Sequence, residues 1–341
     1  MPTPREAMSK SVRLILAGLG LAFVLGWGVR SYIIQPSLSR PVRLTLGFNT
    51  WVGYGPLYVA EKKGFFAAAG LQVNLQRIEG TAERRKALVA GSLDALGTTI
   101  DDVAVGAEEA VPAKIVLAVD HSNGADGIVV SSDIKSVDQL RGRSVAVQPG
   151  FVNHFFLLYL LDQHGISPKD IRIKAMEPDV AGAAFVAGRV DAAVTWEPWL
   201  SKAKTRPGGT VLLTSASAPG IIVDVVTARD AFAKAHPEAV TGLIKAWFQA
   251  VDYLRAYPED GRAIIAQSFL LGQDEVSNML CGVRFLTSSD NERFLNGSPA
   301  PAVDLLRKAA SLYSEANVIK HKPDVDNLIA SQYLRVRRSE E

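Results

Sequence analysis

Cysteine is almost absent from the sequence, since Cys281 is the only one among 341 residues. A single thiol excludes an internal disulfide framework and any metal site built from cysteines alone. The chain also lacks low-complexity tracts, and 48% of its residues are hydrophobic while 21% are charged. This composition excludes a disordered chain and predicts a core large enough for two globular units.

An excess of positive charge is also lacking once the N-terminus is set apart. Of the 37 Lys and Arg and 35 Asp and Glu, residues 1–40 hold five of the bases and one of the acids. The rest of the chain therefore carries 32 basic and 34 acidic side chains. A net charge of −2 gives no electrostatic basis for binding nucleic acid, and we expect no such partner.

Several motifs of catalysis and cofactor binding are missing as well. The sequence contains no Gly-rich phosphate loop, no G-x-S-x-G elbow and no Ser/His/Asp order typical of hydrolases. His121 and His154 have no partner at a spacing typical of metal sites. The sequence thus predicts neither a metal site nor a cofactor, and it favours a protein that is not an enzyme.

The first forty residues are predicted to be a signal peptide or an N-terminal membrane anchor. Three bases precede an uncharged run from Leu14 to Val29, which is typical of an export signal. Ser37 and Ser39 offer a cleavage site well past that run, whereas a retained anchor stays open because the run approaches the roughly 20 residues that span a bilayer. We expect the body of the chain in the periplasm or on the extracytoplasmic face of the cytoplasmic membrane.

The body of the chain repeats one pattern at a separation of about one hundred residues. Each copy has the order strand, loop, helix, strand, helix, judged from apolar periodicity. Strands are expected at 42–46 and 71–78 in the first copy and at 144–147 and 171–175 in the second. Helices are expected near 57–65, 82–90, 155–163 and 180–187, with Thr81 as the N-cap of the second helix.

The two copies match best at the end of each unit, where ALVAGSLDA begins at Ala87 and AFVAGRVDA begins at Ala184. In both segments the glycine suits the left-handed position that ends a helix, and Asp94 and Asp191 are expected to be structural turn residues. The duplication predicts two α/β lobes of similar plan with right-handed crossovers.

The pattern breaks at 129–133 and again at 221–226, which sets the expected domain limits. Residues 41–130 form the first part of lobe 1, 131–222 form lobe 2, and 223–341 complete lobe 1. Helical spacing after Arg229 predicts helices at 240–257, 258–269 and 302–316, with too few strand signals for a third sheet. The chain is therefore expected to cross between the lobes twice.

Five segments between about residues 41 and 270 carry a resemblance to a known family. They are Trp51-x-Gly53-Tyr54-x-Pro56-Leu57-Tyr58-x-Ala60 with Gly64-Phe65-Phe66, Ala90-Gly91-x-x-Asp94, Ser122-x-Gly124-Ala125-Asp126-x-Ile128, Ser136-x-x-Gln139-Leu140-x-Gly142 with Val145-Ala146-Val147, and Trp196-Glu197-Pro198-Trp199. Together they resemble the extracytoplasmic solute-binding proteins of ABC importers for nitrate, sulfonates, taurine and thiamine precursors, the NitT/TauT or SsuA-like family.

The resemblance implies the periplasmic-binding-protein type 2 fold, an α/β fold of two Rossmann-like lobes. Two crossover strands would join the lobes, and a C-terminal helical segment would complete lobe 1. It also implies a monomer that holds a small solute in the interlobe cleft and delivers it to an ABC permease and its ATPase. The inner membrane would be contacted through the N-terminal segment.

Candidate ligand-binding residues follow from the rule that ligands of open α/β sheets lie beyond the carboxyl ends of the strands. This rule selects the loops 49–56, 98–102, 120–128, 148–154, 195–199 and 218–224, which hold six acids and no Lys or Arg. The candidates are Trp51, Tyr54, Asp101, Asp120, Ser122, Asp126, Gln148, Asn153, Trp196, Glu197 and Asp224.

The composition of these loops favours an amine or guanidinium solute, because carboxylates and aromatic faces both stabilise a cation. Anions are usually held by Arg or Lys, and in these loops only N–H groups at helix N-termini are expected to serve. Sulfonate, taurine and nitrate stay open on that account.

Structural interpretations compete for some of these residues. Asp120 and Asp224 lie near the predicted crossovers, where they would cap helices or fix the hinge equally well. Only one of Asp101 and Asp102 is expected to face the cleft if the strand continues through them. Trp199 would pack Pro198 against the lobe as readily as it would touch solute.

Two other functions stay open. An enzyme on the same fold, such as a thiamine-pyrimidine synthase, would be intracellular and cysteine-rich at its active site, which the single cysteine and the export signal disfavour. A membrane-tethered solute sensor would use an uncleaved N-terminal segment to present its lobes to a partner.

Overall fold

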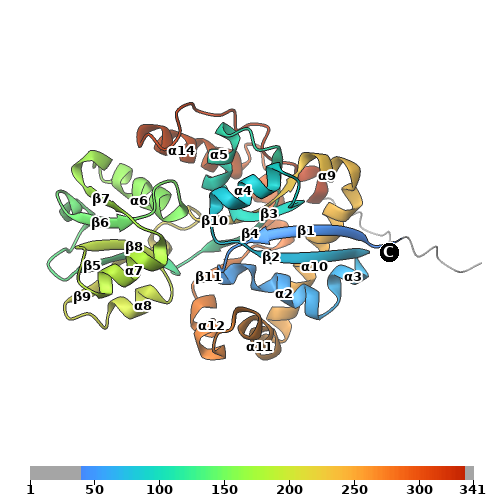
Figure 1. Ribbon diagram of the computed structural model, residues 1–341, viewed down its shortest axis with the longest axis horizontal. Helices are drawn as coiled ribbons and strands as arrows, with labels where there is room; N and C mark the ends of the chain where they lie inside the picture. Colours follow the sequence, from blue (N-terminus) through green and yellow to red (C-terminus); the bar gives the residue numbers. More distant parts are fainter. Residues whose placement is uncertain (1–39, 335–341) are drawn as a thin grey trace, which may run out of the picture. The chain divides into compact units, whose positions relative to one another are not determined.

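The computed structural model describes residues 40–334 of the chain (Figure 1). The predicted signal or anchor lies outside these residues, apart from Arg40. Among residues 40–334 we find no helix that has both the length and the apolar character needed to cross a bilayer.

The first sheet has six strands in the order β11-β4-β10-β3-β1-β2. Its strands are β1 (Val42–Phe48), β2 (Leu71–Arg77), β3 (Ala95–Thr99), β4 (Ala113–Ser122), β10 (Val223–Arg229) and β11 (Val283–Phe285). β1 pairs in parallel with β2 and β3, whereas β10 runs antiparallel to β3 and β4. The short edge strand β11 was not predicted, because three residues give no measurable alternation.

The second sheet has five strands in the order β7-β6-β8-β5-β9. Its strands are β5 (Asp126–Ser131), β6 (Ser144–Val147), β7 (Arg172–Ala175), β8 (Ala192–Trp196) and β9 (Gly209–Thr214). β6 pairs in parallel with β7 and β8, and β5 is antiparallel to β8. The set β7-β6-β8 therefore repeats β2-β1-β3, which confirms two α/β units of one plan.

The chain passes from the first sheet to the second between Ser122 and Asp126, and it returns between Thr214 and Val223. The two expected crossings are present, but the first one lies earlier than residue 130. The turn that separates β4 from β5 is short and includes Gly124, with φ of 121°.

Helices follow most strands of both sheets (Figure 1). After the 3-10 turn Val52–Tyr54 they are α2 (Gly55–Lys62), α3 (Phe65–Ala68), α4 (Thr81–Val89), α5 (Ile100–Glu108), α6 (Val152–Gln163), α7 (Pro178–Val186) and α8 (Trp199–Ala203). The expected N-cap is wrong by one residue, because Gly80 is extended and Thr81 already belongs to α4. Asp101 and Asp102 lie in α5, not in a strand, and both side chains are buried.

The C-terminal part is helical, as expected, and packs on the first sheet. Its helices are α9 (Asp230–Ala235), α10 (Pro237–Ala256), α11 (Pro258–Phe269), α12 (Gln273–Leu280), α13 (Ser288–Asn296) and α14 (Pro301–Glu315). Trp247 of α10 and Tyr313 of α14 are fully buried in the same core as Leu46 and Phe48 of β1. These helices therefore complete the first lobe.

The repeated glycine–aspartate segment has the same structure in both copies. Gly91 and Gly188 have φ of 75° and 71° just after α4 and α7, in the left-handed region that favours glycine. The Asp94 carboxylate accepts a hydrogen bond from the Thr45 N–H at 3.1 Å, and Asp191 accepts one from the Ser144 N–H at 2.8 Å. Each aspartate thus ties the end of its unit to that unit's first strand.

Candidate functional site

Three buried carboxylates meet where the chain passes between the sheets. Asp120 lies two residues before the end of β4, Asp126 begins β5 and Asp224 lies at the start of β10, with exposed fractions of 0%, 2% and 4%. Asp224 stands opposite Asp120 in the sheet. The two crossings therefore bring together acids that lie about one hundred residues apart in the sequence.

Each carboxyl group is hydrogen-bonded to a different side chain, two of them from the segment at the 3-10 turn Val52–Tyr54 and one from α6. The Trp51 indole N–H lies 3.4 Å from both oxygens of Asp120, and the Tyr54 hydroxyl lies 2.8 Å from Asp224 Oδ1. Asn153 of α6 donates from Nδ2 to Asp126 Oδ1 at 3.3 Å. These bonds orient the three acids without supplying a positive charge.

Burial dominates the electrostatics of the three acids. The pKa of Asp120 is raised to about 8. Burial is the main cause and the charge of Asp126 adds to it, while the hydrogen bond from Trp51 acts in the opposite direction. Burial likewise raises the pKa of Asp126 to about 7. The pKa of Asp224 is raised well above its ordinary value by burial and then by the charge of Asp120.

An inner cavity with an empty volume of about 350 Å³ lies against these acids. Asp126 and Asp224 line it directly, whereas Asp120 lies behind Trp51. The complete lining is Asn49, Trp51, Tyr54, Thr81, Arg84, Thr98, Thr99, Asp126, Phe151, Val152, Trp196, Ile222 and Asp224. The rings of Trp51 and Trp196, one from each half of the chain, lie 6.4 Å apart between their centroids.

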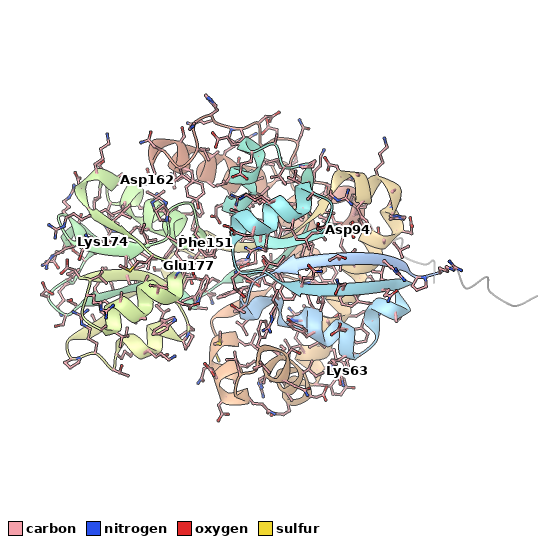
Figure 2. All side chains as sticks on the ribbon, in the orientation of Figure 1. Lys63, Asp94, Phe151, Asp162, Lys174 and Glu177 are labelled. Atoms are coloured by element: carbon pink, nitrogen blue, oxygen red, sulfur yellow. The ribbon has the colours of Figure 1, made fainter. Side chains whose placement is uncertain are left out.

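A larger outer cavity shares Asn49, Phe151 and Trp196 with the inner one. Its empty volume is about 730 Å³, part of it open to solvent. Phe151 and Glu177, both labelled in Figure 2, come from the residues just before α6 and α7.

Arg84 lines the inner cavity but is not among the candidates chosen from the sequence. It is 2% exposed, and its Nη1 donates to the carbonyls of Ile78 and Glu79 at 2.6 and 2.7 Å. Its Nε has no hydrogen-bond partner among residues 40–334. The expectation that only helix N–H groups are available to an anion is therefore wrong.

The position of Arg84 explains why it was missed. It belongs to α4, outside the six loops, and its long side chain folds back toward the start of the helix. The pair Gly80-Thr81, which opens a helix just after β2, was the signal that could have pointed to it, because helices after parallel strands begin at the ligand-binding edge.

Most of the other candidates come together as expected. Trp51, Tyr54, Trp196, Asp126 and Asp224 line the inner cavity, and Gln148 lines the outer one. Ser122 and Asn153 are buried and act on Asp126, since the Ser122 hydroxyl accepts from the Asp126 N–H at 3.2 Å. Ser122 also lies 2.7 Å from the Ser215 hydroxyl, which joins the two crossings.

Glu197 and Asp101, two of the candidates, lie outside both cavities. Glu197 accepts hydrogen bonds from the backbone and the hydroxyl of Ser201 at 3.1 and 3.0 Å, so its carboxylate serves the first turn of α8. Asp101 is buried beside Tyr313, whose hydroxyl lies 2.6 Å from it.

Two further residues have structural roles. Asp102 pairs with Arg85 and accepts from Thr98 at 2.6 Å. The indole of Trp199 donates to Asp179 at 2.8 Å and lies against Gly182 of α7, where an added Cβ would come within 2.5 Å of the ring. Trp199 therefore packs on α7 and lines neither the inner nor the outer cavity.

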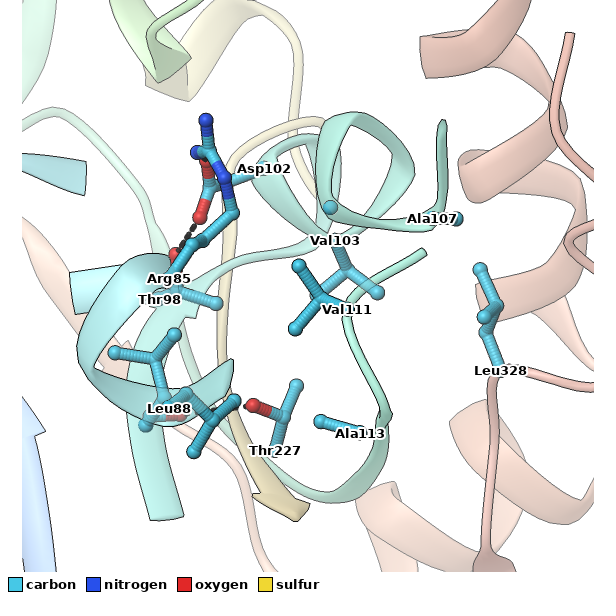
Figure 3. Close-up of a pocket in the computed structure, with 12 residues that line it drawn as sticks. Arg85, Leu88, Thr98, Asp102, Val103, Ala107, Val111, Ala113, Thr227 and Leu328 are labelled. Atoms are coloured by element: carbon cyan, nitrogen blue, oxygen red, sulfur yellow. Dashed lines mark hydrogen bonds and ion pairs between the residues drawn. The ribbon is translucent and has the colours of Figure 1, made fainter. Parts of the chain in front are cut away.

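A third cavity lies between α4, α5 and Leu328 (Figure 3). Its empty volume is about 320 Å³ and most of its lining is apolar. The two charged side chains that face it, Arg85 and Asp102, form an ion pair with each other. This cavity thus offers a solute little beyond apolar contact.

Within residues 40–334, no group of three or more His, Cys, Asp or Glu is arranged so that it could hold a metal ion. Among the residues that line the inner cavity, Arg84 is the one with a permanent positive charge.

A model of the NMT1-like family matches residues 38–270, about two thirds of the chain. The chain belongs to this family. The match covers the segments of β1 to α11 and so includes every residue that lines the inner cavity.

Relatives of known name agree with this membership. The taurine-binding periplasmic protein of Escherichia coli K12 is 24% identical, over 87% of this chain and 94% of that protein. A putative aliphatic sulfonates-binding protein of Bacillus subtilis 168 is 25% identical, over 82% of this chain and 84% of that protein. The resemblance to SsuA-like solute-binding proteins of ABC importers is thereby confirmed.

Solved structures confirm the two-lobed type 2 fold. The periplasmic aliphatic sulphonate binding protein SsuA of Escherichia coli superposes with a TM-score of 0.73 at 22% identity, over 85% of this chain and 92% of that one. A DszB mutant in complex with biphenyl-2-sulfinic acid has a TM-score of 0.61 at 16% identity, over 86% and 97%. The fold is thus shared by proteins with different ligands, and the contents of the site must decide the solute.

Proposed function

We propose that this chain is the solute-binding subunit of an ABC importer and that its solute carries a positively charged nitrogen. The observation that carries the proposal is the excess of buried acidic side chains over basic ones in and beside one cavity. The first lobe would comprise residues up to Ser122 and from Val223 onward, and the second would comprise Asp126 to Thr214.

Acidic side chains outnumber basic ones around the inner cavity. Asp126 and Asp224 face it, Asp120 lies directly behind Trp51, and Arg84 is the base among the lining residues. Burial without a counter-charge favours the neutral form of such acids, and an ammonium or guanidinium group would supply both the charge and the N–H donors that stabilise their carboxylate form. The ring faces of Trp51 and Trp196 would add cation–π attraction.

Arg84 extends the proposal to solutes that also carry an acidic group. Its guanidinium is fixed by two carbonyls at the start of α4, where the helix N-terminus also favours negative charge. A solute with a cationic nitrogen at one end and a sulfonate or carboxylate at the other would satisfy both signs of charge. The name of the taurine-binding relative is consistent with such a zwitterion.

Capture would follow the two-lobed plan. Solute would enter through the outer cavity, and closure would bring Trp51 of one lobe and Trp196 of the other around it. The closed monomer would then dock on an ABC permease with its ATPase at the outer face of the cytoplasmic membrane. The N-terminal mass of the mature protein would show whether residues 1–40 are cleaved or remain as an anchor, as a membrane-tethered sensor would require.

Isothermal titration calorimetry of the purified full chain tests the proposal. The probes are guanidinium, ethylammonium, taurine, ethanesulfonate and nitrate. Solutes with a cationic nitrogen should bind, and Asp126→Asn should weaken them at least about tenfold, since a charge-assisted hydrogen bond is worth about 1.5–3 kcal/mol. Glu197→Gln is the matched control and should leave every affinity unchanged, because Glu197 lies outside both cavities.

Arg84→Met distinguishes the contribution of the acidic group of the solute from that of its cationic nitrogen. It should weaken taurine and leave ethylammonium unaffected, because only taurine carries an acidic group. Binding of ethanesulfonate or nitrate as tight as that of taurine, and insensitive to Asp126→Asn, would refute the cationic solute. Turnover of any probe would favour an enzyme on this fold.

A further inference from the structure

The Tyr54 hydroxyl is placed between two hydrogen-bond acceptors inside the site. It lies 2.8 Å from Asp224 Oδ1 and 3.0 Å from the backbone carbonyl of Thr98. A hydroxyl has one hydrogen, so an ionised Asp224 would compete with the carbonyl for it. If Asp224 carries a proton, it donates to the Tyr54 oxygen while Tyr54 donates to Thr98, and every group is paired.

The groups that face Asp224 favour the protonated form. Asp120 of β4, Asp126 of β5 and Asp101 of α5 contribute negative charge, and burial acts in the same direction on the pKa of Asp224. Arg84 of α4 is the base that faces it, and this guanidinium is already held by two carbonyls. A buried acid among three others is most stable when neutral.

The same arrangement recurs outside the two cavities. The Tyr313 hydroxyl lies 2.6 Å from Asp101 Oδ2 and 3.1 Å from the carbonyl of Phe151. Tyr54 and Tyr313 are therefore each positioned between a buried carboxyl group and a carbonyl. An uncharged carboxyl group explains both arrangements, because it can donate a hydrogen bond to the tyrosine oxygen as well as accept one.

We infer that Asp224 holds a proton in the empty site and that a cationic solute replaces this proton on binding. The inference rests on the proposed function, since it needs a solute with a positive nitrogen. Asp224 would release its proton to water, Tyr54 would turn its own hydrogen toward the new carboxylate, and a solute N–H would donate to the same carboxyl group. Cation capture and proton release would then be one event.

A consequence is selectivity that depends on pH. A neutral molecule of the same shape cannot replace the proton, because it brings no charge to balance the carboxylate. Guanidinium and urea form the sharpest pair of probes, since both are planar and of equal size. Guanidinium also keeps its charge at every pH of interest, so any proton released comes from the protein.

The experiment is calorimetry of the full chain with each probe in buffers of different ionisation enthalpy, from about pH 6 to about pH 8. Guanidinium should release about one proton from Asp224, and each proton released makes affinity rise about tenfold per pH unit. Urea should release none. Asp224→Asn, whose amide still donates to Tyr54, should lower the number of protons released by about one, whereas Asp252→Asn on the exposed face of α10 should not.

The possible failures are distinct. If no probe binds at any pH, the proposed function is overturned. If guanidinium binds with the same proton release in the wild type and in Asp224→Asn, the proposed function stands and the inference is overturned.

A measurement without solute covers the case in which Asp224→Asn no longer binds. Infrared spectra of the empty protein near neutral pH should contain the C=O stretching band of a protonated carboxylic acid. That band should lose the intensity of one carboxyl group in Asp224→Asn, since Asp120 and Asp126 also contribute to it, with folding confirmed by a cooperative thermal transition. A spectrum unchanged by the substitution would overturn the inference by itself.

Discussion

At the residue scale, Gly53 shows how a missing side chain shapes the site. A Cβ at this position would lie 2.1 Å from Asp120 Oδ2 and 2.3 Å from the Trp51 indole nitrogen. The hydrogen bond between Trp51 and Asp120 thus occupies the space that any larger residue would fill. The glycine is required by close approach, since its φ lies outside the left-handed region.

Gly53→Ala should therefore separate Trp51 from Asp120. We expect the free energy of unfolding to fall by about 1–3 kcal/mol, the usual cost of overpacking, and solute affinity to fall with it. Urea unfolding followed by tryptophan fluorescence measures the first effect. The cost should be smaller in a Trp51→Phe background, which lacks the indole nitrogen, and an equal cost in both backgrounds would contradict the explanation.

At the element scale, the two copies of the repeat are fixed by their aspartates. Asp191 accepts from both the N–H and the hydroxyl of Ser144, at 2.8 and 2.6 Å, and these bonds lower its pKa. Asp94 accepts from Thr45 and also pairs with Arg229 of β10 at 2.9 Å. Each aspartate therefore makes two interactions, and those of the copy in the first half include an ion pair.

Asp191→Asn should lower the free energy of unfolding by about 1–2 kcal/mol, and Asp94→Asn should lower it by more. The lowered pKa of Asp191 makes its stabilising contribution present above about pH 4 and lost as pH falls through the pKa of the folded state. Denaturant unfolding at pH 7 and in acid checks both statements. Asp252→Asn is the control, because its side chain is 76% exposed.

At the scale of the whole molecule, the buried acids tie stability to pH. The pKa of Asp120 is about 8 and that of Asp126 about 7 in the folded protein, against an ordinary value of 3.8. The folded state thus binds more protons than the unfolded state between these limits, so this contribution to stability falls as pH rises. His154, whose pKa is lowered to about 4 by burial, acts in the opposite direction below its ordinary value of 6.5.

The empty protein should accordingly lose thermal stability between about pH 6.5 and about pH 8, a range that His154 does not affect. A bound cationic solute should restore it, because the cation balances the ionised acids. Differential scanning calorimetry across this range is the measurement. A variant with Asn at positions 120, 126 and 224 should show a flat profile, and a wild type whose melting temperature rises with pH would contradict the prediction.

The sequence by itself determined the features that depend on local spacing. Gly91 with Asp94 and Gly188 with Asp191 could be placed in advance, because a left-handed glycine and the turn after it are set by neighbouring residues. The duplicated order of strands and helices followed from apolar periodicity, and Trp51, Tyr54, Asp126 and Trp196 followed from the rule on strand ends.

Only the tertiary structure decided which polar groups share the cavity. Asp224 meets Tyr54 across 170 residues of sequence, and Arg84 reaches the site because its side chain folds back along α4. Glu197, which stands between two aromatic residues in the sequence, bonds instead to Ser201 in the next turn. The direction in which a long side chain turns depends on the partners that the fold brings near it, and no spacing along the chain encodes that.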